Sequence, residues 1–200
     1  MWVVCTLITP FAKTNAMDDS PSVASDDIRY QGKAVSDEDW IREFLAGQET
    51  GVLGLTDDEE PHLVTQLFVC EGDSIYVHGA RDGRAYDLVS STDEPQACFT
   101  TSEMGRFIPA EEPVNFTVEY ASVVAYGPVS LLTERAEKRE ILESFMDKFA
   151  PQLTPGEDYE PMSEESIDRT AVYRLAVDRW SAKRGEKPAD EPGAYDSPLR

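Results

Sequence analysis

The stretch of the sequence best suited to chemistry is residues 79–84, Gly-Ala-Arg-Asp-Gly-Arg. Its two glycines and two arginines follow an alternating run over residues 74–78, and Tyr86, Leu88 and Val89 then supply an apolar helical face. Backbone N–H groups at a helix N-terminus, beside a guanidinium, form a site for an anion such as phosphate. The residues alone fit two interpretations, an anion-binding turn or an ordinary strand-to-helix connection with solvated arginines.

Sets of residues typical of metal sites or of acid–base and nucleophilic catalysis are hard to recognise in this sequence. The chain has two histidines, His62 and His78, both in strand-like runs and neither at a spacing typical of metal ligands. Nothing in the sequence suggests a nucleophilic triad, and the carboxylates are too numerous for any catalytic pair to be singled out. We therefore expect no metal site and leave the catalytic residues unassigned.

Charge limits the partners that the protein can have. With 18 basic and 39 acidic residues the formal charge is -21, and such a surface repels nucleic acid and anionic membranes. A hydrophobic content of 40% and clear strand patterns argue against disorder as the reason for this acidity. Adaptation to a cytosol of high salt is the favoured explanation, and an ordinary acidic protein is the alternative.

Cysteine usage predicts a reducing, cytoplasmic location. Cys5, Cys70 and Cys98 are odd in number and form no close pair, so a disulfide framework is not expected. Cys70 and Cys98 lie in strand-like runs and are predicted to be small core residues.

The sequence divides into a central domain and two ends. Residues 1–9 are apolar but lack the length of a membrane span and the basic start of a signal peptide. We expect translation to begin at Met17, with residues 1–16 upstream of it; a strand or anchor that packs on the domain is the alternative. The expected parts are a loose N-terminal extension over 1–35, a folded domain over 36–183 and a disordered tail, rich in proline and charge, over 184–200.

The predicted elements of the domain alternate between strands and amphipathic helices. Ser36 is the expected N-cap of the first helix, and Thr133 that of a later helix in which Lys138 faces solvent. Gly127-Pro128 should bend or bulge a long strand segment. The expected ranges are a helix to Gly47, strands at 51–56, 62–70 and 74–78, a loop at 104–113, β structure over 114–132, and a last strand at 170–177.

Six segments of the sequence resemble segments of a known protein family. They occur in the same order and at the same spacing as in that family. They are Ile41-Arg-Glu-Phe-Leu, Gly51-Val-Leu-Gly-Leu-Thr, Ile75-Tyr-Val-His-Gly-Ala-Arg-Asp-Gly-Arg, Pro95-Gln-Ala-Cys-Phe, Tyr120-Ala-Ser-Val-Val-Ala-Tyr-Gly and Glu137-Lys-Arg. Together they resemble the pyridoxamine 5'-phosphate oxidase-like, FMN-binding split barrels, in the branch related to nitroimidazole-resistance proteins. The resemblance covers roughly residues 36–183. It implies a mainly β fold, a six-stranded split β-barrel of Greek-key type with peripheral helices. It also implies a homodimer with FMN in each of two clefts at the subunit interface.

The resemblance also assigns site residues. Those implied to border the flavin ring are Val64, Thr65, Gln66 and Leu67; those around the phosphate are His78, Gly79, Ala80 and Arg84; and Ser122, Trp180 and Lys183 are implied to lie near the flavin. The family usually has a lysine after the arginine at position 84, whereas this chain has Ala85, so Arg81 or Lys183 would have to compensate. His78 could instead be an ordinary strand histidine, and Trp180 a plug at the end of the barrel.

The implied function is that of a flavin-dependent oxidoreductase. It would pass electrons from a reduced nicotinamide to a small-molecule acceptor, with a nitroaromatic compound as one candidate, and the cofactor would carry the reactivity. The alternatives are a flavin-nucleotide-binding or storage protein without turnover, and a split barrel that binds deazaflavin or haem. Pyridoxamine phosphate oxidation itself is disfavoured, since that enzyme's basic cluster for the substrate phosphate is not recognisable here.

Overall fold

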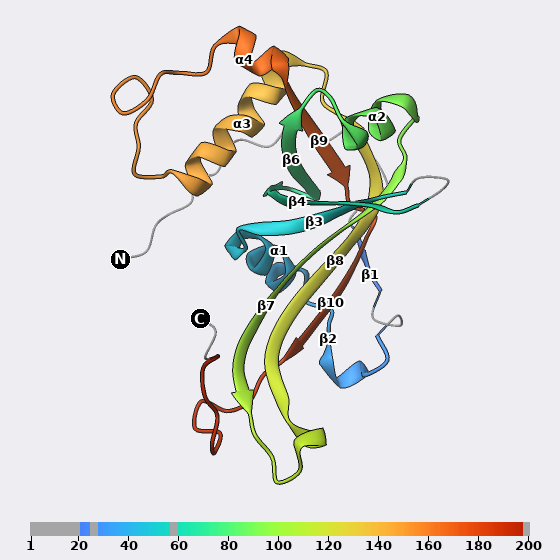
Figure 1. Cartoon of the computed structure of the whole chain (residues 1–200), viewed down its shortest axis with the longest axis vertical. Helices are drawn as coiled ribbons and strands as arrows, with labels where there is room; N and C mark the ends of the chain where they lie inside the picture. Colours follow the sequence, from blue (N-terminus) through green and yellow to red (C-terminus); the bar gives the residue numbers. More distant parts are fainter. Residues whose placement is uncertain (1–20, 25–27, 57–59, 198–200) are drawn as a thin grey trace.

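One strongly curved sheet dominates the computed structural model, which describes residues 21–24, 28–56 and 60–197 (Figure 1). Its strands are β1 (Ser22–Val23), β2 (Ala34–Val35), β3 (Thr50–Leu55), β4 (His62–Leu67), β5 (Val69–Glu71), β6 (Ser74–Ala80), β7 (Gln96–Ile108), β8 (Thr117–Leu131), β9 (Thr170–Ala176) and β10 (Arg179–Gly185). The helices are α1 (Glu38–Gly47), α2 (Arg84–Ser91), α3 (Arg135–Phe149) and α4 (Glu164–Arg169). Short 3-10 turns occur at Gln31–Lys33 and Pro113–Asn115.

The strand order makes the sheet a split barrel. Along the sheet the strands follow each other as β4-β3-β7-β8-β9-β6-β5, so β4 and β5 lie at opposite ends although they are consecutive in the chain. Phe68 alone separates them, is fully buried, and packs against Phe99 with 4.7 Å between ring centroids. The mainly β, Greek-key split barrel predicted from the sequence is therefore confirmed. The single strand expected over 62–70 is wrong, because the chain leaves one end of the sheet at Phe68 and joins the other.

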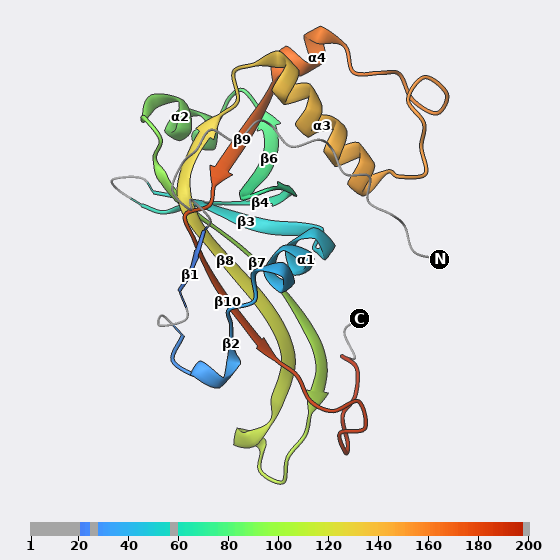
Figure 2. The same ribbon diagram turned by 180° about the vertical axis from the view of Figure 1, so that it is seen from behind.

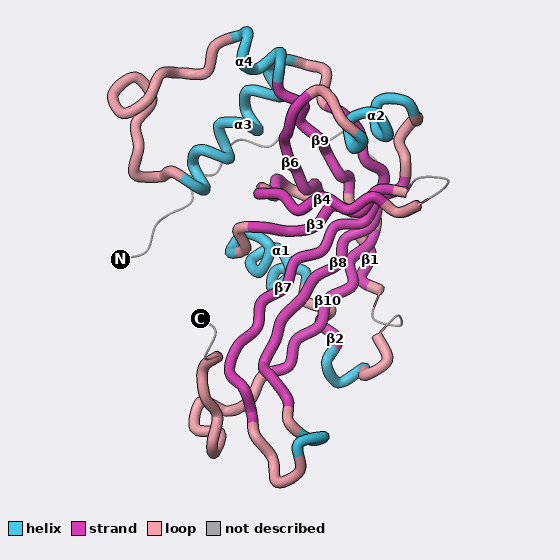
Figure 3. Tube along the Cα trace, viewed as in Figure 1, coloured by secondary structure: helices cyan, strands magenta, loops and turns pink. Residues whose placement is uncertain are grey.

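The β7–β8 hairpin extends far beyond the barrel (Figure 3). The loop predicted over 104–113 begins only after Ile108, because β7 continues past a register shift between Met104 and Phe107. Within the shifted stretch the guanidinium of Arg106 binds both carboxylate oxygens of Glu119, at 2.8 and 2.7 Å, and so holds the two strands together. The residues next to Arg106 and Glu119 in the sequence give no indication of this pairing, because the two lie far apart in the chain.

Strand β8 links the two halves of the sheet at Gly127. Through Tyr126 it pairs with β10, and from Val129 onward it pairs with β9. A Cβ atom at position 127 would lie 1.8 Å from the Ala176 carbonyl oxygen, so only glycine allows this close approach. β8 runs through Gly127-Pro128 as one strand, and the predicted bend or bulge is replaced by this change of partner.

Helices cover the barrel on two sides, and both views agree that α3 and α4 lie at the β6–β9 end (Figures 1 and 2). Helix α1 buries Ile41 and Leu45 in the main core, whereas α3 and α4 bury a second cluster against β6 and β9. Three details differ from the predictions. The N-cap of α1 is Asp37 and not Ser36, and the N-cap position of α3 is Glu134 and not Thr133. Lys138 does not face solvent: it is 5% exposed, and its ammonium lies 2.5 Å from the Ile167 carbonyl oxygen.

Both ends of the described chain pack on the sheet. β1 pairs in parallel with β10, and β2 pairs with β10 in antiparallel. At the other end, where we expected a disordered tail, Tyr195 exchanges two backbone hydrogen bonds with Phe107 and stacks on its ring. Met17 and the proposed upstream residues 1–16 lie outside the described residues. None of the helices in the described parts of the chain has the length and apolar character of a bilayer span.

Candidate functional site

The predicted anion-binding turn forms between β6 and α2. Gly83 occupies the N-cap position of α2 with φ of +83°, a left-handed backbone conformation that favours glycine. Among the described residues no side chain caps this helix, so the first N–H groups of α2 can bind an external acceptor. A Cβ added at Gly79 or Gly83 would meet no atom within 4 Å, which leaves open space beside the backbone for a ligand.

A cleft of about 310 Å³ opens beside this turn. It is lined by Leu53, His62, Leu63, Val64, Gln66, Val77, Gly79, Ala80, Asp82, Gly83, Arg84, Ala85 and Tyr173. Five residues assigned from the sequence therefore meet at one place: Val64, Gln66, Gly79, Ala80 and Arg84. The structure brings the implied ring wall and the implied phosphate turn together although their elements are separate in the chain.

Strand β4 forms one wall of this cleft. Val64 and Gln66 line it from one face of the strand and the exposed Leu63 also borders it, whereas Thr65 and Leu67, also predicted to border the ring, lie on the exposed face and do not line it. Among the described strands β4 pairs only with β3. Its outer edge therefore presents backbone N–H and C=O groups that can hydrogen-bond to a planar ligand.

The two arginines of the turn have different partners. The Arg84 guanidinium donates a 2.5 Å hydrogen bond to a carboxylate oxygen of Glu60. Arg81 donates to the Asp168 carbonyl oxygen at 3.0 Å and to the Tyr86 hydroxyl at 3.3 Å. Only Arg84 lines the cleft, and Arg81 instead ties the turn to the end of α4.

His78 and Trp180, two further predicted site residues, also lie away from the cleft. Val77 lines the cleft, and His78, the next residue of the strand, points to the opposite face of the sheet. Its ring packs edge-on against the ring of Phe145 in α3, with 4.6 Å between the ring centroids. Burial lowers the pKa of His78 below its usual 6.5, so this imidazole is neutral at pH 7. Trp180 is 2% exposed and belongs to the main core of the subunit.

Ser122 and Lys183 lie together, but at another place. They are directly opposite each other in the β8–β10 ladder, and both line a cleft with Tyr120 and Ser181 on the outer face of the sheet. No residue of this cleft also lines the one beside Gly83. Within one subunit, five of the predicted residues thus line the cleft beside Gly83, two line this second cleft, and the other five line neither.

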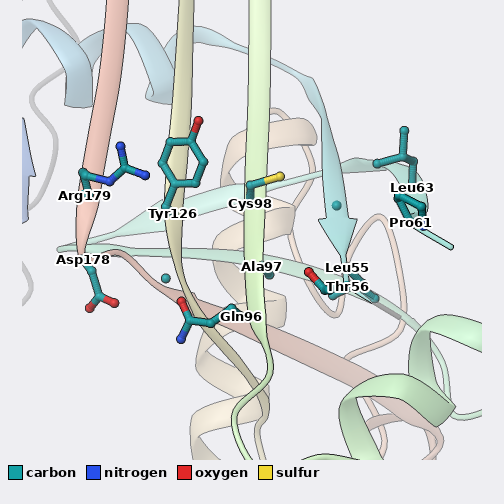
Figure 4. A pocket seen from close by; sticks show the side chains of 12 residues that line it. Leu55, Thr56, Pro61, Leu63, Gln96, Ala97, Cys98, Tyr126, Asp178 and Arg179 are labelled. Atoms are coloured by element: carbon teal, nitrogen blue, oxygen red, sulfur yellow. The ribbon is translucent and has the colours of Figure 1, made fainter. Parts of the chain in front are cut away.

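A third cleft, of about 460 Å³, lies further along the outer face (Figure 4). Cys98, Tyr126 and Arg179 project into it from adjacent strands, and the Arg179 guanidinium lies 4.1 Å from the centre of the Tyr126 ring. Leu63 of β4, 66% exposed, lines its far side. Cys98 is thus a cleft residue and half-buried, where a core position was predicted.

Sequence reasoning missed several residues of the cleft beside Gly83. Leu53, Val77 and Tyr173 line it because strands from three parts of the chain converge there, and nothing local marks them. Burial raises the pKa of the Tyr173 hydroxyl above its usual value of 10, so this group stays protonated at pH 7. Glu60 could have been noticed as an acid just before β4, but its pairing with Arg84 depends on the fold.

The chemistry of this cleft is that of a binding site. It combines an uncapped helix N-terminus, one arginine, an edge strand and apolar side chains, but no acid–base pair within hydrogen-bonding distance is found among its described residues. Such a site suits a phosphorylated, planar cofactor that carries its own reactivity.

Comparison with known proteins agrees with this description. The family model described as Pyridoxamine 5'-phosphate oxidase matches residues 37–184. No match was found among curated proteins. Among solved structures, the flavocytochrome Anf3 from Azotobacter vinelandii is 25% identical, with a TM-score of 0.71 over 90% of this chain and 80% of that chain.

Two further structures show the same fold. The FAD and heme binding protein from Mycobacterium smegmatis is 19% identical, with a TM-score of 0.68 over 78% of this chain and 74% of that one. A candidate 5-nitroimidazole antibiotic resistance protein from Bacteroides thetaiotaomicron is 19% identical, with a TM-score of 0.61 over 77% of this chain and 90% of that one.

Proposed function

Because the chain belongs to the Pyridoxamine 5'-phosphate oxidase family, we propose that it binds a flavin in the cleft between β4, β6 and α2 and serves as a flavin-dependent oxidoreductase. The observation that carries this proposal is the convergence of Val64 and Gln66 with the Gly79–Arg84 turn around one cleft. The flavin-binding proteins among the structural neighbours support it, since the names of two of them state a flavin.

The phosphate of the flavin binds at the N-terminus of α2. Its acceptors face the uncapped N–H groups that follow Gly83, and Arg84 supplies the positive charge. The position after Arg84 is Ala85, so backbone donors carry more of the phosphate binding here than in relatives with a lysine at this position. In concentrated salt this arrangement is an advantage, because exposed ion pairs are screened.

The ring of the flavin lies along β4. The outer edge of β4 offers backbone donors and acceptors to the heteroatoms of the ring, while Val64, Val77 and Leu53 provide an apolar surface. FMN fits this division into one phosphate site and one ring site. When bound, the flavin supplies the redox chemistry, accepting a hydride from reduced nicotinamide and passing electrons to a small acceptor such as a nitroaromatic compound. The protein positions the cofactor and excludes water from one face.

A homodimer is part of this proposal. Leu63 and Leu67 on the outer face of β4 are 66% and 44% exposed, and Leu63 also borders the large cleft with Cys98 and Tyr126. Covering this face by a second copy removes apolar surface from water and encloses the β4 edge. The clefts that contain Ser122 and Lys183 would then belong to the same dimer surface.

The test is the spectrum of the purified protein and the identity of its released cofactor. We expect a flavin absorption spectrum, FMN on release, and bleaching of the visible band when NADH or NADPH is added without oxygen. A protein that is colourless and does not bind added FMN contradicts the flavin proposal. Flavin that binds but is not reduced by either nucleotide supports a binding or storage protein. A haem or deazaflavin spectrum would show that this group, and not FMN, is the cofactor.

A further inference from the structure

Helix α3 lies beside β6 and carries Lys148 in its last turn (Figure 1). The Lys148 ammonium donates a hydrogen bond of 3.1 Å to the Phe68 carbonyl oxygen and lies 4.4 Å from the centre of the Phe68 ring. No carboxylate of the described residues lies within ion-pair distance of this ammonium. Burial lowers the pKa of Lys148 below its usual 10.5. The partners of this half-buried lysine are thus the backbone and the ring of Phe68.

Phe68 occupies the point at which two ladders of the sheet stop. The pairing of β4 with β3 ends at Leu67, and the pairing of β5 with β6 begins at Val69, so Phe68 belongs to neither ladder. The whole residue is buried, and a buried carbonyl group requires a hydrogen-bond donor. Lys148 supplies this donor from α3, and it thereby fixes the end of β4 to the helix.

The same helix contacts the other wall of the proposed flavin cleft. Phe145 lies three residues before Lys148, on the same side of α3, and its ring packs against that of His78 in β6. His78 directly precedes Gly79 and Ala80, which line the cleft. Among the described strands no ladder joins β4 to β6. Helix α3 therefore connects two walls that the sheet does not connect directly.

The beginning of α3 is tied to the turn between β6 and α2. The Arg135 guanidinium binds both carboxylate oxygens of Asp168, at 2.8 and 2.6 Å. The Asp168 carbonyl oxygen in turn accepts a hydrogen bond of 3.0 Å from Arg81, which belongs to that turn. One continuous helix of 15 residues thus reaches the turn at its first residue, β6 at Phe145 and the end of β4 at Lys148.

We propose that α3 braces the flavin cleft from outside and that Lys148 is a positioning residue, which holds the β4 wall at a fixed distance from the phosphate turn. Lys148 does not line the cleft, so it acts through Phe68. With the ring site and the phosphate site held at a set spacing, less freedom is lost when one ligand fills both. The inference rests on the proposed function for the identity of this ligand, whereas the effect of Lys148 on β4 and β5 does not depend on it.

Amide hydrogen exchange of the full chain without ligand tests the brace. Lys148→Met keeps the length of the side chain but removes the donor, and it should speed exchange in residues 62–71 by about tenfold while β8 exchanges as in the wild type. Lys148→Arg retains a donor and should restore slow exchange. Lys187→Met, the same substitution at a lysine beside Glu191, is the matched control and should resemble the wild type. Unchanged exchange over residues 62–71 in Lys148→Met would overturn the proposal.

The ratio of the affinities for FMN and riboflavin tests the positioning of the two sites. Riboflavin has the ring without the phosphate, so the ratio reports how well one ligand fills both sites. In Lys148→Met this ratio should fall about fivefold, and in Lys148→Arg it should stay at the wild-type value. An unchanged ratio in Lys148→Met would show that the lysine only stabilises the fold. A wild type that binds no FMN contradicts the proposed function, and hydrogen exchange alone then decides whether α3 is a brace.

Discussion

Arg84 and Glu60 form an ion pair beside the α2 N-terminus, with 2.5 Å between the Arg84 Nη1 and a Glu60 carboxylate oxygen. Both side chains are partly exposed, 38% for Arg84 and 64% for Glu60. A phosphate that binds at Gly83 meets an arginine that already has an anionic partner. The pair therefore competes with the ligand that we propose for this cleft.

Glu60→Gln should tighten FMN binding. Removing the carboxylate takes away one anionic partner that competes with the phosphate for Arg84, and because an exposed ion pair is worth up to about 1 kcal/mol, the gain is about threefold to fivefold. Titration of the apoprotein with FMN at low salt, followed by flavin fluorescence, measures it. Glu111→Gln, an exposed acid in the loop after β7, is the control; equal affinity for wild type and Glu60→Gln would show that the pair does not compete.

Arg84→Ala and Arg81→Ala should have different effects. Loss of Arg84 removes a charge-assisted phosphate contact of about 1.5–3 kcal/mol and weakens FMN by roughly tenfold to a hundredfold. Loss of Arg81 removes its hydrogen bonds to the Asp168 carbonyl and Tyr86, so it lowers the free energy of unfolding by about 1 kcal/mol and changes FMN affinity less. FMN titration and denaturant unfolding of both variants distinguish these roles. An Arg84→Ala variant with wild-type affinity contradicts the phosphate assignment.

Leu63→Asp should dissociate the proposed homodimer. A carboxylate on the outer face of β4 would be buried by the second copy without a partner, which strongly disfavours association. Light scattering after size exclusion gives the mass of each species. Leu153→Asp, at a residue that is 42% exposed in the loop after α3, should leave the mass unchanged. A monomeric wild type, or a dimer that persists in Leu63→Asp, contradicts the proposed interface.

Gly127→Ala should destabilise the fold strongly. The added Cβ would lie 1.8 Å from the Ala176 carbonyl oxygen, and since that atom is backbone, the strands themselves have to separate. We expect a loss of about 3 kcal/mol or more in the free energy of unfolding, measured by denaturant titration. Gly47→Ala is the control, because a Cβ at the end of α1 meets nothing within 4 Å. Similar stability in both variants would contradict the role assigned to Gly127.

Glu119 should contribute stability that depends on pH. The Arg106 guanidinium and the Lys187 N–H lower the pKa of this carboxyl from 4.5 to about 2. Since the folded pKa lies below the unfolded one, the contribution is complete above about pH 4.5 and is lost as pH falls toward 2. Wild type should therefore be more stable than Glu119→Gln at pH 6, with the difference shrinking at lower pH. A difference that is constant from pH 6 to pH 2 contradicts the assignment.

Most of the fold could be predicted because its signals are local. Alternating residues marked β6, and amphipathic stretches marked α1 and α3. The errors came from tertiary contacts: Phe68 is buried by Phe99, and the Arg106–Glu119 pair extends β7. Lys138 has a polar side chain, yet the Ile167 carbonyl provides a buried partner that the helical pattern of α3 does not reveal.

The site was predictable to the extent that it follows one continuous stretch. Gly79, Ala80 and Arg84 line the expected cleft because strand, turn and helix follow each other directly. Side-chain direction was harder, since His78 points to α3 and Trp180 into the core. Strand alternation indicates which residues share a face, but only the packed helices decide which face is the inside.

The position of Phe68 between β4 and β5 bears on how the proposed flavin cleft accommodates a ligand. Among the described strands, β4 and β6, which form its two walls, are not joined by a ladder of hydrogen bonds; the chain connects them through Phe68 and β5. The width of the cleft is therefore set by side-chain packing. We therefore expect a bulky ring to change the distance between β4 and β6 more readily than that between any two paired strands, whose spacing is fixed by backbone hydrogen bonds.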